Sequence, residues 1–389
     1  MMRIFFVLLV LLTAPAALAG EAPPRAEPIP NAERTFQEVM ELIRTDYVDA
    51  DLTEDALWTA AIDGLLARLH QGEKRPVNLL MDPRQSSDLK VGIDGSVTGI
   101  GIMIKEVEGI VFVLRSLPGG GAEEAGITSG DRILAIDDAP VKGMDLGQIA
   151  HAIRGPAKTE VKLLMQRDTD EWTVRVTRAP VVLPAVEGQM VDDRTGLLQI
   201  RHFSASTTKQ LGQTLAELRK DGAEQLILDL RGCPGGLLEP AMEAAQVFLP
   251  HGKTIVQLQW RTKDDEVLTS EGNGSWAEVP LAILVDERTA SGAEILAAAL
   301  RENGRGRILG APTFGKGTVE RLYSLDAGWS LKLSTARFTS PDGNSWQAVG
   351  IIPDIAVTAD EASETATESG DLDADVHIRA ALTVLGLGG

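Results

Sequence analysis

The sequence contains a single cysteine, Cys233, which excludes an intrachain disulfide. No apolar run in it approaches the ~20 residues that a membrane-spanning helix needs. Basic residues are scarce, because 37 Lys and Arg stand against 56 Asp and Glu for a net charge of -19. This charge argues against nucleic acid or an anionic membrane surface as a partner. The five histidines show no metal-ligand spacing, so neither a metal nor a cofactor is expected.

The first 19 residues have the pattern of a secretory signal peptide. Arg3 precedes a continuous apolar run from Phe5 to Leu12, and Ala17-Leu18-Ala19 is a cleavage site of the small-x-small type. We therefore expect residues 1–19 to be removed and the mature protein to be exported, to the periplasm. Without disulfides it must fold around ordinary hydrophobic cores, for which 44% apolar residues suffice.

Composition and periodicity divide the rest of the chain into regions. Apolar residues at helical spacing, short β-rich runs between glycine turns, and alternating strands and helices follow one another. The predicted regions are a flexible leader (20–30), an N-terminal helical region (31–95), a compact β-rich module (96–178), an α/β domain (179–358), a solvated acidic linker (359–375) and a C-terminal helical tail (376–389).

Ser291 is the strongest candidate for a nucleophile. It follows the apolar run Leu281–Val285 and begins a stretch that favours a helix, so its hydroxyl is expected at a helix start, among N–H groups that favour negative charge. Lys316 follows 25 residues later (316 - 291 = 25), far enough for a return strand to bring its amine beside that hydroxyl. Serine with lysine is a known pairing of nucleophile and base. The alternative is a helix-capping serine and a surface lysine.

A glycine-containing loop, Cys233-Pro234-Gly235-Gly236, follows the predicted buried strand Leu226–Leu230. Its backbone N–H groups have little side chain in the way, which suits an oxyanion hole, although an ordinary strand-to-helix turn is an equal alternative. Asp229 and Arg231, just before the loop, are predicted to be structural, pairing with each other or with the backbone.

Three segments, in this order and spacing, resemble the C-terminal processing peptidases, which are tail-specific serine proteases of family S41. They are Asp229–Leu238 (DLRGCPGGLL), Thr289–Glu294 (TASGAE) and Phe314–Glu320 (FGKGTVE). Within the β-rich module, Thr98–Ile102 and Ala122–Ile133 resemble the family's PDZ domain. The likeness covers nearly the whole chain after the leader.

The resemblance implies a multidomain α/β protein with N-terminal helices, a PDZ β-rich module and a ClpP/crotonase-like α/β peptidase core. It implies a serine-type endopeptidase that cleaves proteins near their C termini, with Ser291 as nucleophile and Lys316 as base. It also implies an oxyanion hole formed by the amide of Gly292 with that of Gly235 or, as the second choice, Gly236. The expected partners are proteins or peptides with accessible C termini, and a homo-oligomer or an adaptor stays open.

The PDZ-like module has a physical use in such an enzyme. Gly99, Ile100, Gly101 and Ile102 can form a nest of amides for a terminal carboxylate beside a sheet edge, so that a peptide adds as an extra strand. The alternative is an ordinary glycine-containing hairpin.

The chain departs from the family pattern in three places. Cys233 stands where the family usually has asparagine, and Gly119-Gly120-Gly121-Ala122 where it commonly has Gly-Ser-Pro-Ala. Glu320 replaces the family's glutamine four residues after the lysine. Because residues four apart on a strand face the same side, we expect Glu320 to approach the Lys316 amine.

Two other functions remain open on the sequence. One is a thiol hydrolase that uses Cys233 and His202, although a lone exported cysteine is more often a packing residue. The other is a catalytically weak PDZ scaffold that binds protein tails without cutting them, for which Glu320 is the support.

Overall fold

The computed structural model describes residues 29, 31–48, 52–69, 77–358 and 372–386. The expected signal peptide, all of the leader except residue 29, and linker residues 359–371 lie outside these described residues. By its internal contacts the chain divides into two units, residues 1–64 and 65–389, and each is described by itself. None of the helices in the described ranges has the length and apolar character needed to span a membrane.

The first unit holds helix α1 (Ala32–Asp46) and most of α2 (Glu54–Arg68). Their predicted helical spacing is confirmed. The rings of Phe36 and Trp58 lie 6.1 Å apart and join the two helices.

Helix α3 (Pro83–Asp94) and strand β1 (Leu79–Met81) begin the second unit. Asp82 starts the helix because its Oδ1 accepts from the Gln85 amide at 2.8 Å, while Gln85 Oε1 accepts from the Asp82 amide at 3.1 Å. The predicted N-terminal helical region, 31–95, also contains strand β1, which pairs antiparallel with β18 (Ser330–Thr339). A three-residue strand has no periodicity of its own, and its partner lies some 250 residues away in the sequence.

The PDZ β-rich module follows as predicted. Its main sheet has the order β3-β4-β5-β7-β8, with β6 on β5, and β2 pairs antiparallel with β9. Buried Val111, Ile133, Leu163 and Val176 come from four strands of this β-rich module, and they share one core. The elements are β2 (Ser96–Gly99), β3 (Ile102–Val107), β4 (Ile110–Ser116), α4 (Gly121–Glu124), β5 (Arg132–Ile136), β6 (Ala139–Pro140), α5 (Leu146–Ile153), β7 (Glu160–Arg167), β8 (Asp170–Thr177) and β9 (Ala179–Val182).

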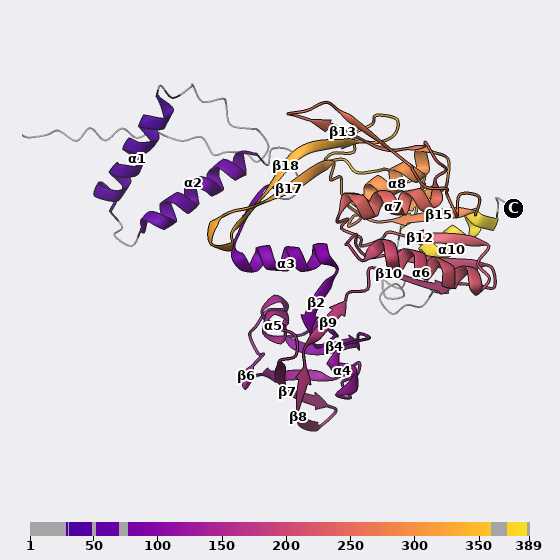
Figure 1. Cartoon of the computed structure of the whole chain (residues 1–389), viewed down its shortest axis with the longest axis horizontal. Coiled ribbons are helices and arrows are strands. Elements are labelled where there is room, and N and C mark those ends of the chain that lie inside the picture. The colour runs from indigo at the N-terminus through magenta and orange to yellow at the C-terminus, as the bar shows by residue number, and fades with distance from the viewer. Residues whose placement is uncertain (1–28, 30, 49–51, 70–76, 359–371, 387–389) are drawn as a thin grey trace, which may run out of the picture. The chain divides into compact units, whose positions relative to one another are not determined.

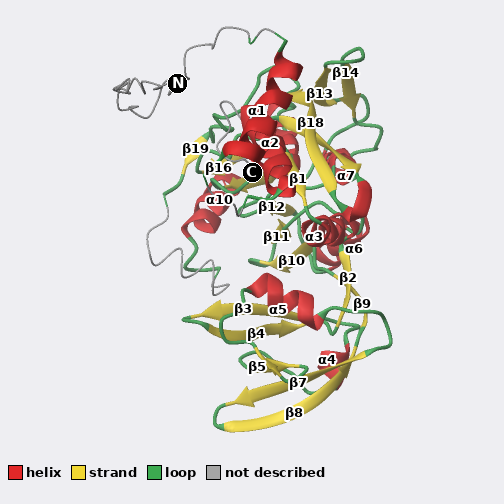
Figure 2. Ribbon diagram, turned by 90° about the vertical axis from the view of Figure 1, so that its left-hand side faces the viewer, coloured by secondary structure: helices red, strands yellow, loops and turns green. Residues whose placement is uncertain are grey.

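The peptidase-like α/β domain is built on a six-stranded sheet of order β10-β11-β12-β15-β16-β19 (Figure 1). All neighbours are parallel except β10 and β11. Neighbouring residues of β11 point to opposite faces, so that Leu198 packs in the cluster with α6, α7 and α8, whereas Leu197 packs with α10. Figure 2 shows α10 and α6 on opposite sides of the sheet. The elements are β10 (Val186–Met190), β11 (Thr195–Ile200), α6 (Thr207–Lys220), β12 (Gln225–Asp229), α7 (Leu238–Phe248), β15 (Leu281–Val285), α8 (Gly292–Glu302), β16 (Arg307–Gly310), β19 (Ile355–Ala356) and α10 (Val376–Gly386).

A second sheet, not foreseen from the sequence, holds the segment after Lys316. Its order is β1-β18-β13-β14, with β17 also paired to β18. Strand β17 begins just after the loop that carries Lys316. The chain then turns back, and β18 pairs with β17 in the antiparallel direction. The added elements are β13 (Thr254–Trp260), β14 (Glu266–Thr269), β17 (Thr318–Ser324) and the short 3-10 turn η1 (Asp326–Gly328).

Candidate active site

Ser291 lies between the end of β15 and the first residue of α8, as the sequence predicts, and is 7% exposed. Its backbone has φ 56 and ψ -116, a left-handed conformation that a residue with a side chain holds only when its surroundings impose it. The turn before it supplies such surroundings. Asp286 Oδ1 accepts from the Thr289 amide at 2.9 Å, and the Thr289 hydroxyl donates to Leu230 O at 2.9 Å. The turn that carries Ser291 is thus fastened to the end of β12.

Glu294, three residues into α8, is fully buried and joins the two predicted catalytic segments. Its Oε2 accepts from the backbone amides of both Ser291, at 2.8 Å, and Lys316, at 2.9 Å. Its Oε1 accepts from the Thr313 hydroxyl at 2.5 Å and from the Gly315 amide at 2.7 Å. One carboxylate therefore holds the serine turn and the lysine loop together.

The surroundings of Glu294 act on its pKa in opposite directions. Burial raises the pKa of the Glu294 carboxyl above its ordinary value, and the hydrogen bonds from Thr313 and the three amides offset this only in part. The three amides need acceptor oxygens in either charge state, whereas the Thr313 hydroxyl can donate to the carboxylate or accept from the protonated acid.

Lys316 reaches Glu320, as expected, although Lys316 precedes β17 and the register of β17 on β18 shifts between Val319 and Glu320, so regular strand alternation is not the cause. Its Nζ lies 2.5 Å from Glu320 Oε2, and the Thr318 hydroxyl donates to Glu320 Oε1 at 2.8 Å. The two charged side chains are 21% and 11% exposed, so little water screens the pair. The Trp346 indole donates to Lys316 O at 3.1 Å and fixes the lysine backbone from the other side.

The loop Cys233–Gly236 packs against the serine turn. The Ala290 amide donates to Cys233 O at 2.9 Å, and the Phe203 amide donates to Gly235 O at 2.9 Å. At Gly235 a Cβ would lie 2.7 Å from Ser291 Cβ, and at Gly236 a Cβ would lie 2.0 Å from Phe203 O. Both glycines have positive φ, so a side chain is excluded at each by conformation and by space. The structure therefore brings the predicted oxyanion loop beside Ser291 and Gly292.

Cys233 is buried, and this burial raises the pKa of its thiol to about 12, an effect that the Gly235 amide opposes by hydrogen bonding. At neutral pH the thiol is protonated and inaccessible. Burial and the neighbouring Arg201 lower the pKa of His202, so that its imidazole is neutral there. A neutral thiol is a weak nucleophile, so these features argue against the thiol hydrolase.

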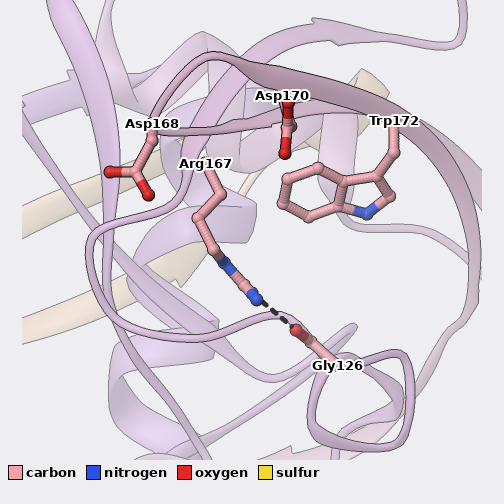
Figure 3. A pocket seen from close by; sticks show the side chains of 5 residues that line it. All are labelled: Gly126, Arg167, Asp168, Asp170 and Trp172. Carbon is pink, nitrogen blue, oxygen red and sulfur yellow. Dashed lines mark hydrogen bonds between the residues drawn. The ribbon is translucent and has the colours of Figure 1, made fainter.

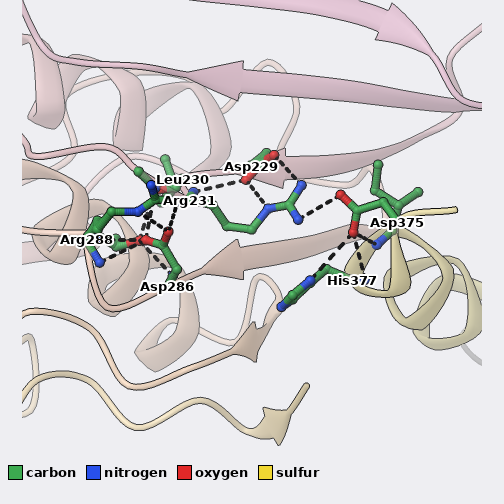
Figure 4. Close-up of polar contacts among 10 residues, drawn as sticks. Asp229, Leu230, Arg231, Asp286, Arg288, Asp375 and His377 are labelled. Carbon is green, nitrogen blue, oxygen red and sulfur yellow. Dashed lines mark hydrogen bonds and ion pairs between the residues drawn. The ribbon is translucent and has the colours of Figure 1, made fainter. Parts of the chain in front are cut away.

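Arg231 was predicted to pair with Asp229, and the structure confirms this (Figure 4). Its guanidinium binds Asp229 through two nitrogens, at 2.9 and 2.8 Å, and it also lies 2.8 Å from Asp375 Oδ2. Asp375 had been assigned to the solvated linker. Instead it is 2% exposed and begins α10 by accepting from the His377 amide at 2.9 Å. The last helix is thereby tied to the strand that leads into the oxyanion loop.

The four residues predicted to bind a peptide tail line one cavity of 110 Å³ in the PDZ module. Gly101 has φ 76, and a Cβ there would lie 2.6 Å from the Cα of Gly120, so close backbone packing shapes this loop. The cavity-lining residues are Val97, Gly99, Ile100, Gly101, Ile102, Ile104, Leu117, Ala150, Ile153, Arg154, Val181 and Leu183.

A second cavity of the PDZ module lies at the end of the β7–β8 hairpin (Figure 3). Arg167 donates to Gly126 O at 2.9 Å, pairs with Asp131 at 2.7 Å, and lies 5.3 Å from the Trp172 ring centroid. Its guanidinium thus braces the hairpin against the preceding loop.

Comparison with known proteins agrees with this arrangement. The sequence profile of Peptidase family S41 matches residues 194–357, and a PDZ domain profile matches residues 112–167. The carboxy-terminal processing protease CtpA of Bacillus subtilis (strain 168) is 34% identical over 316 residues, which are 81% of this chain and 66% of that protein. A probable CtpA-like serine protease of Staphylococcus aureus (strain bovine RF122 / ET3-1) is 30% identical over 324 residues, which are 83% and 64%.

The chain thus spans slightly less than two thirds of the length of these two relatives. Among solved structures, the crystal structure of a putative S41 protease from Bacteroides fragilis has the same fold. The TM-score is 0.52 at 15% identity, and the match covers 94% of this chain and 99% of that one.

Proposed function

This chain belongs to peptidase family S41 and carries a PDZ domain, and we propose that it is an exported, periplasmic serine endopeptidase that cleaves proteins near their C termini. The observation that carries the proposal is the shared acceptor. The amides of Ser291 and Lys316 donate to the same oxygen of Glu294, so that the two catalytic segments lie side by side. Export rests on the signal-peptide pattern of residues 1–19.

In the proposed reaction Ser291 Oγ attacks the scissile carbonyl carbon while its proton passes to the neutral Lys316 amine. The C–N bond then breaks, and Lys316 returns the proton to the leaving amine. A water molecule deprotonated by Lys316 hydrolyses the acyl-enzyme ester and restores Ser291.

Two backbone amides would stabilise the oxyanion, and Gly292 at the start of α8 supplies the first. The Gly235 amide already interacts with the Cys233 sulfur. The nitrogen of Gly236, in contrast, lies 3.7 Å from the place of a Cβ on Gly292. This arrangement favours Gly236 over Gly235 as the second donor.

The PDZ module would select the substrate. A terminal carboxylate bound by the Gly99–Ile102 loop, with its peptide added to the sheet edge, would present the residues upstream of the tail for cleavage. Natural substrates would then be proteins with unstructured, accessible C termini.

One observation favours a second candidate, a PDZ scaffold with little activity. The Lys316 amine lies 2.5 Å from Glu320 Oε2, and an amine held by a carboxylate is not free to approach the hydroxyl of Ser291. Turnover measurements separate the two functions.

The test is digestion of a disordered protein with an apolar C-terminal tail. We expect Ser291→Ala and Lys316→Ala each to abolish cleavage, and the double variant to be no worse than either single one, because groups that act as a unit are non-additive. The matched controls are Ser275→Ala and Lys209→Ala, at exposed positions, which should cleave like the wild type. Cleavage that survives Ser291→Ala would refute the proposal, and binding without turnover by the wild type would support the scaffold.

A further inference from the structure

Residues 346–351 form a loop that packs against the loop carrying Lys316. The Ala348 amide donates to Gly315 O at 2.8 Å, and the Trp346 indole donates to Lys316 O at 3.1 Å. Trp346 itself is 5% exposed, so this side of the contact is anchored in the core of the α/β domain. The two loops are therefore held together at the lysine and at the residue before it.

Val349, in the middle of this loop, is joined to the candidate catalytic residues through Gly315. A Cβ on Gly315 would lie 3.0 Å from the Val349 nitrogen, so the two backbones touch. The Gly315 amide donates to Oε1 of Glu294, whose Oε2 accepts from the Ser291 amide. The backbone of Val349 is thus separated from that of Ser291 by one glycine and one carboxyl group.

The Val349 side chain faces water, although its backbone is tightly packed. It is 64% exposed, the highest value for a large apolar side chain among residues 77–358. The residues on both sides of it are left-handed, Ala348 with φ 64 and Gly350 with φ 88. A Cβ on Gly350 would lie 2.1 Å from Thr313 O, so close packing imposes this turn. Left-handed backbone at an alanine is uncommon and costs free energy, and here it holds an apolar side chain in solvent at the edge of the site.

We propose that Val349 is a specificity-determining residue, whose side chain contacts an apolar side chain of the substrate near the scissile bond. The inference rests on the proposed function, in which that bond lies at Ser291. An extended peptide advances about 3.3 Å per residue, so residues two or three positions from the bond lie within about 10 Å of the serine and reach the loop beside Lys316. Contact with Val349 removes apolar surface of both partners from water, which favours leucine over serine at that position of the substrate.

The first test scans leucine, serine and glutamate along one unstructured peptide with an apolar tail, and mass spectrometry locates the cleaved bond. At one position near that bond, Val349→Ser should lower the ratio of kcat/KM for leucine over serine about tenfold. Val349→Leu should keep the ratio, and Val349→Lys should raise kcat/KM for glutamate at the same position, because the charges attract.

The matched control is Val267→Ser, since Val267 on β14 is 59% exposed and lies outside the contacts described above. It should leave every ratio at the wild-type value. Unchanged ratios in both Val349→Ser and Val349→Lys would overturn the inference.

The second test measures binding and needs no turnover. The leucine and serine peptides are titrated into the full-length Ser291→Ala protein, with and without Val349→Ser, and followed by fluorescence anisotropy. All peptides have the same C terminus, so the PDZ module contributes equally to their affinities. Leucine at the position that Val349 contacts should strengthen binding about tenfold over serine, and Val349→Ser should remove this difference.

The two tests distinguish the inference from the proposed function. If the wild type cleaved none of the peptides, the proposed function would be wrong, and the binding ratios would still decide on Val349. If the wild type cleaved them and Val349→Ser changed neither the kinetic nor the binding ratios, only the inference would be wrong.

Discussion

Replacement of Arg231 by methionine tests how much the buried ion pairs at the end of β12 stabilise the peptidase domain. The Arg231 side chain is 8% exposed and lies between the carboxylates of Asp229, 2% exposed, and Asp375, 3% exposed. In Arg231→Met the two carboxylates keep their burial but lose their cation. Removing one partner from a buried ion pair typically costs about 3–5 kcal/mol, and we expect a loss of that size in the free energy of unfolding.

Two further variants give smaller losses in the free energy of unfolding with which Arg231→Met can be compared. Asp375→Asn leaves the Arg231–Asp229 pair balanced, so the loss should be about 2 kcal/mol, the value of one charged hydrogen bond. Arg194→Met is the matched control, because Arg194 pairs with Glu224 at 2.7 Å on the surface, where the two side chains are 71% and 63% exposed. An exposed pair is worth less than about 1 kcal/mol.

The assay is urea unfolding followed by tryptophan fluorescence. Trp276 and Trp346 are 3% and 5% exposed in the α/β domain and report on its unfolding. The expected order of loss is Arg231→Met, then Asp375→Asn, then Arg194→Met. If Arg231→Met cost no more than Asp375→Asn, the reasoning from unbalanced buried charge would be refuted.

Three other changes test the active site and the PDZ groove. Glu294→Gln turns one oxygen into an NH2 donor that faces either the Gly315 amide or the amides of Ser291 and Lys316, so kcat should fall about tenfold or more with little change in KM; steady-state kinetics check this, and wild-type kcat would contradict it. Gly236→Ala places a Cβ 2.0 Å from Phe203 O and should reduce cleavage strongly. Gly212→Ala on α6, where a Cβ meets no atom within 4 Å, should not reduce it. Equal cleavage rates for the two variants would contradict the steric reasoning. A C-terminally amidated peptide should bind the full-length Ser291→Ala protein more weakly than the free acid in calorimetry, since the carboxylate loses its amide donors; equal affinities would exclude tail recognition.

The elements around Ser291 could be read from the sequence because local signals specify them. The apolar run Leu281–Val285, the small residues after Ser291 and the glycines of the Cys233–Gly236 loop each predict a strand, a helix or a turn. The structure has β15, α8 and the loop at those places. The expected approach of Glu320 to Lys316 is also observed, but the reason was wrong, because Lys316 precedes β17 and the strand register shifts between Val319 and Glu320.

The contacts that were missed join segments far apart in the chain. Glu294 carried a visible signal, since Ser-Gly-Ala-Glu is the spacing of a capping box, but its bonds to Gly315 and Lys316 depend on how the return loop folds. Asp375 belongs to an acidic run whose composition indicates solvation, and its buried partner Arg231 lies 144 residues away. Charge patterns reveal the presence of carboxylates and not which of them meets a distant cation.

The pairing of β1 with β18 makes the PDZ module an insertion in the catalytic domain. The chain leaves the catalytic domain after α3 and returns at β10, and the two crossing strands, β2 and β9, run antiparallel to each other. Where they meet, the Leu183 amide donates to Gly95 O at 2.9 Å. An insert whose two ends are adjacent can be exchanged for another binding module, or for a short turn, without stretching its host. The PDZ module and the α/β domain are therefore separable parts of the chain, and under the proposed function tail recognition would be able to change while the six-stranded sheet keeps its sequence.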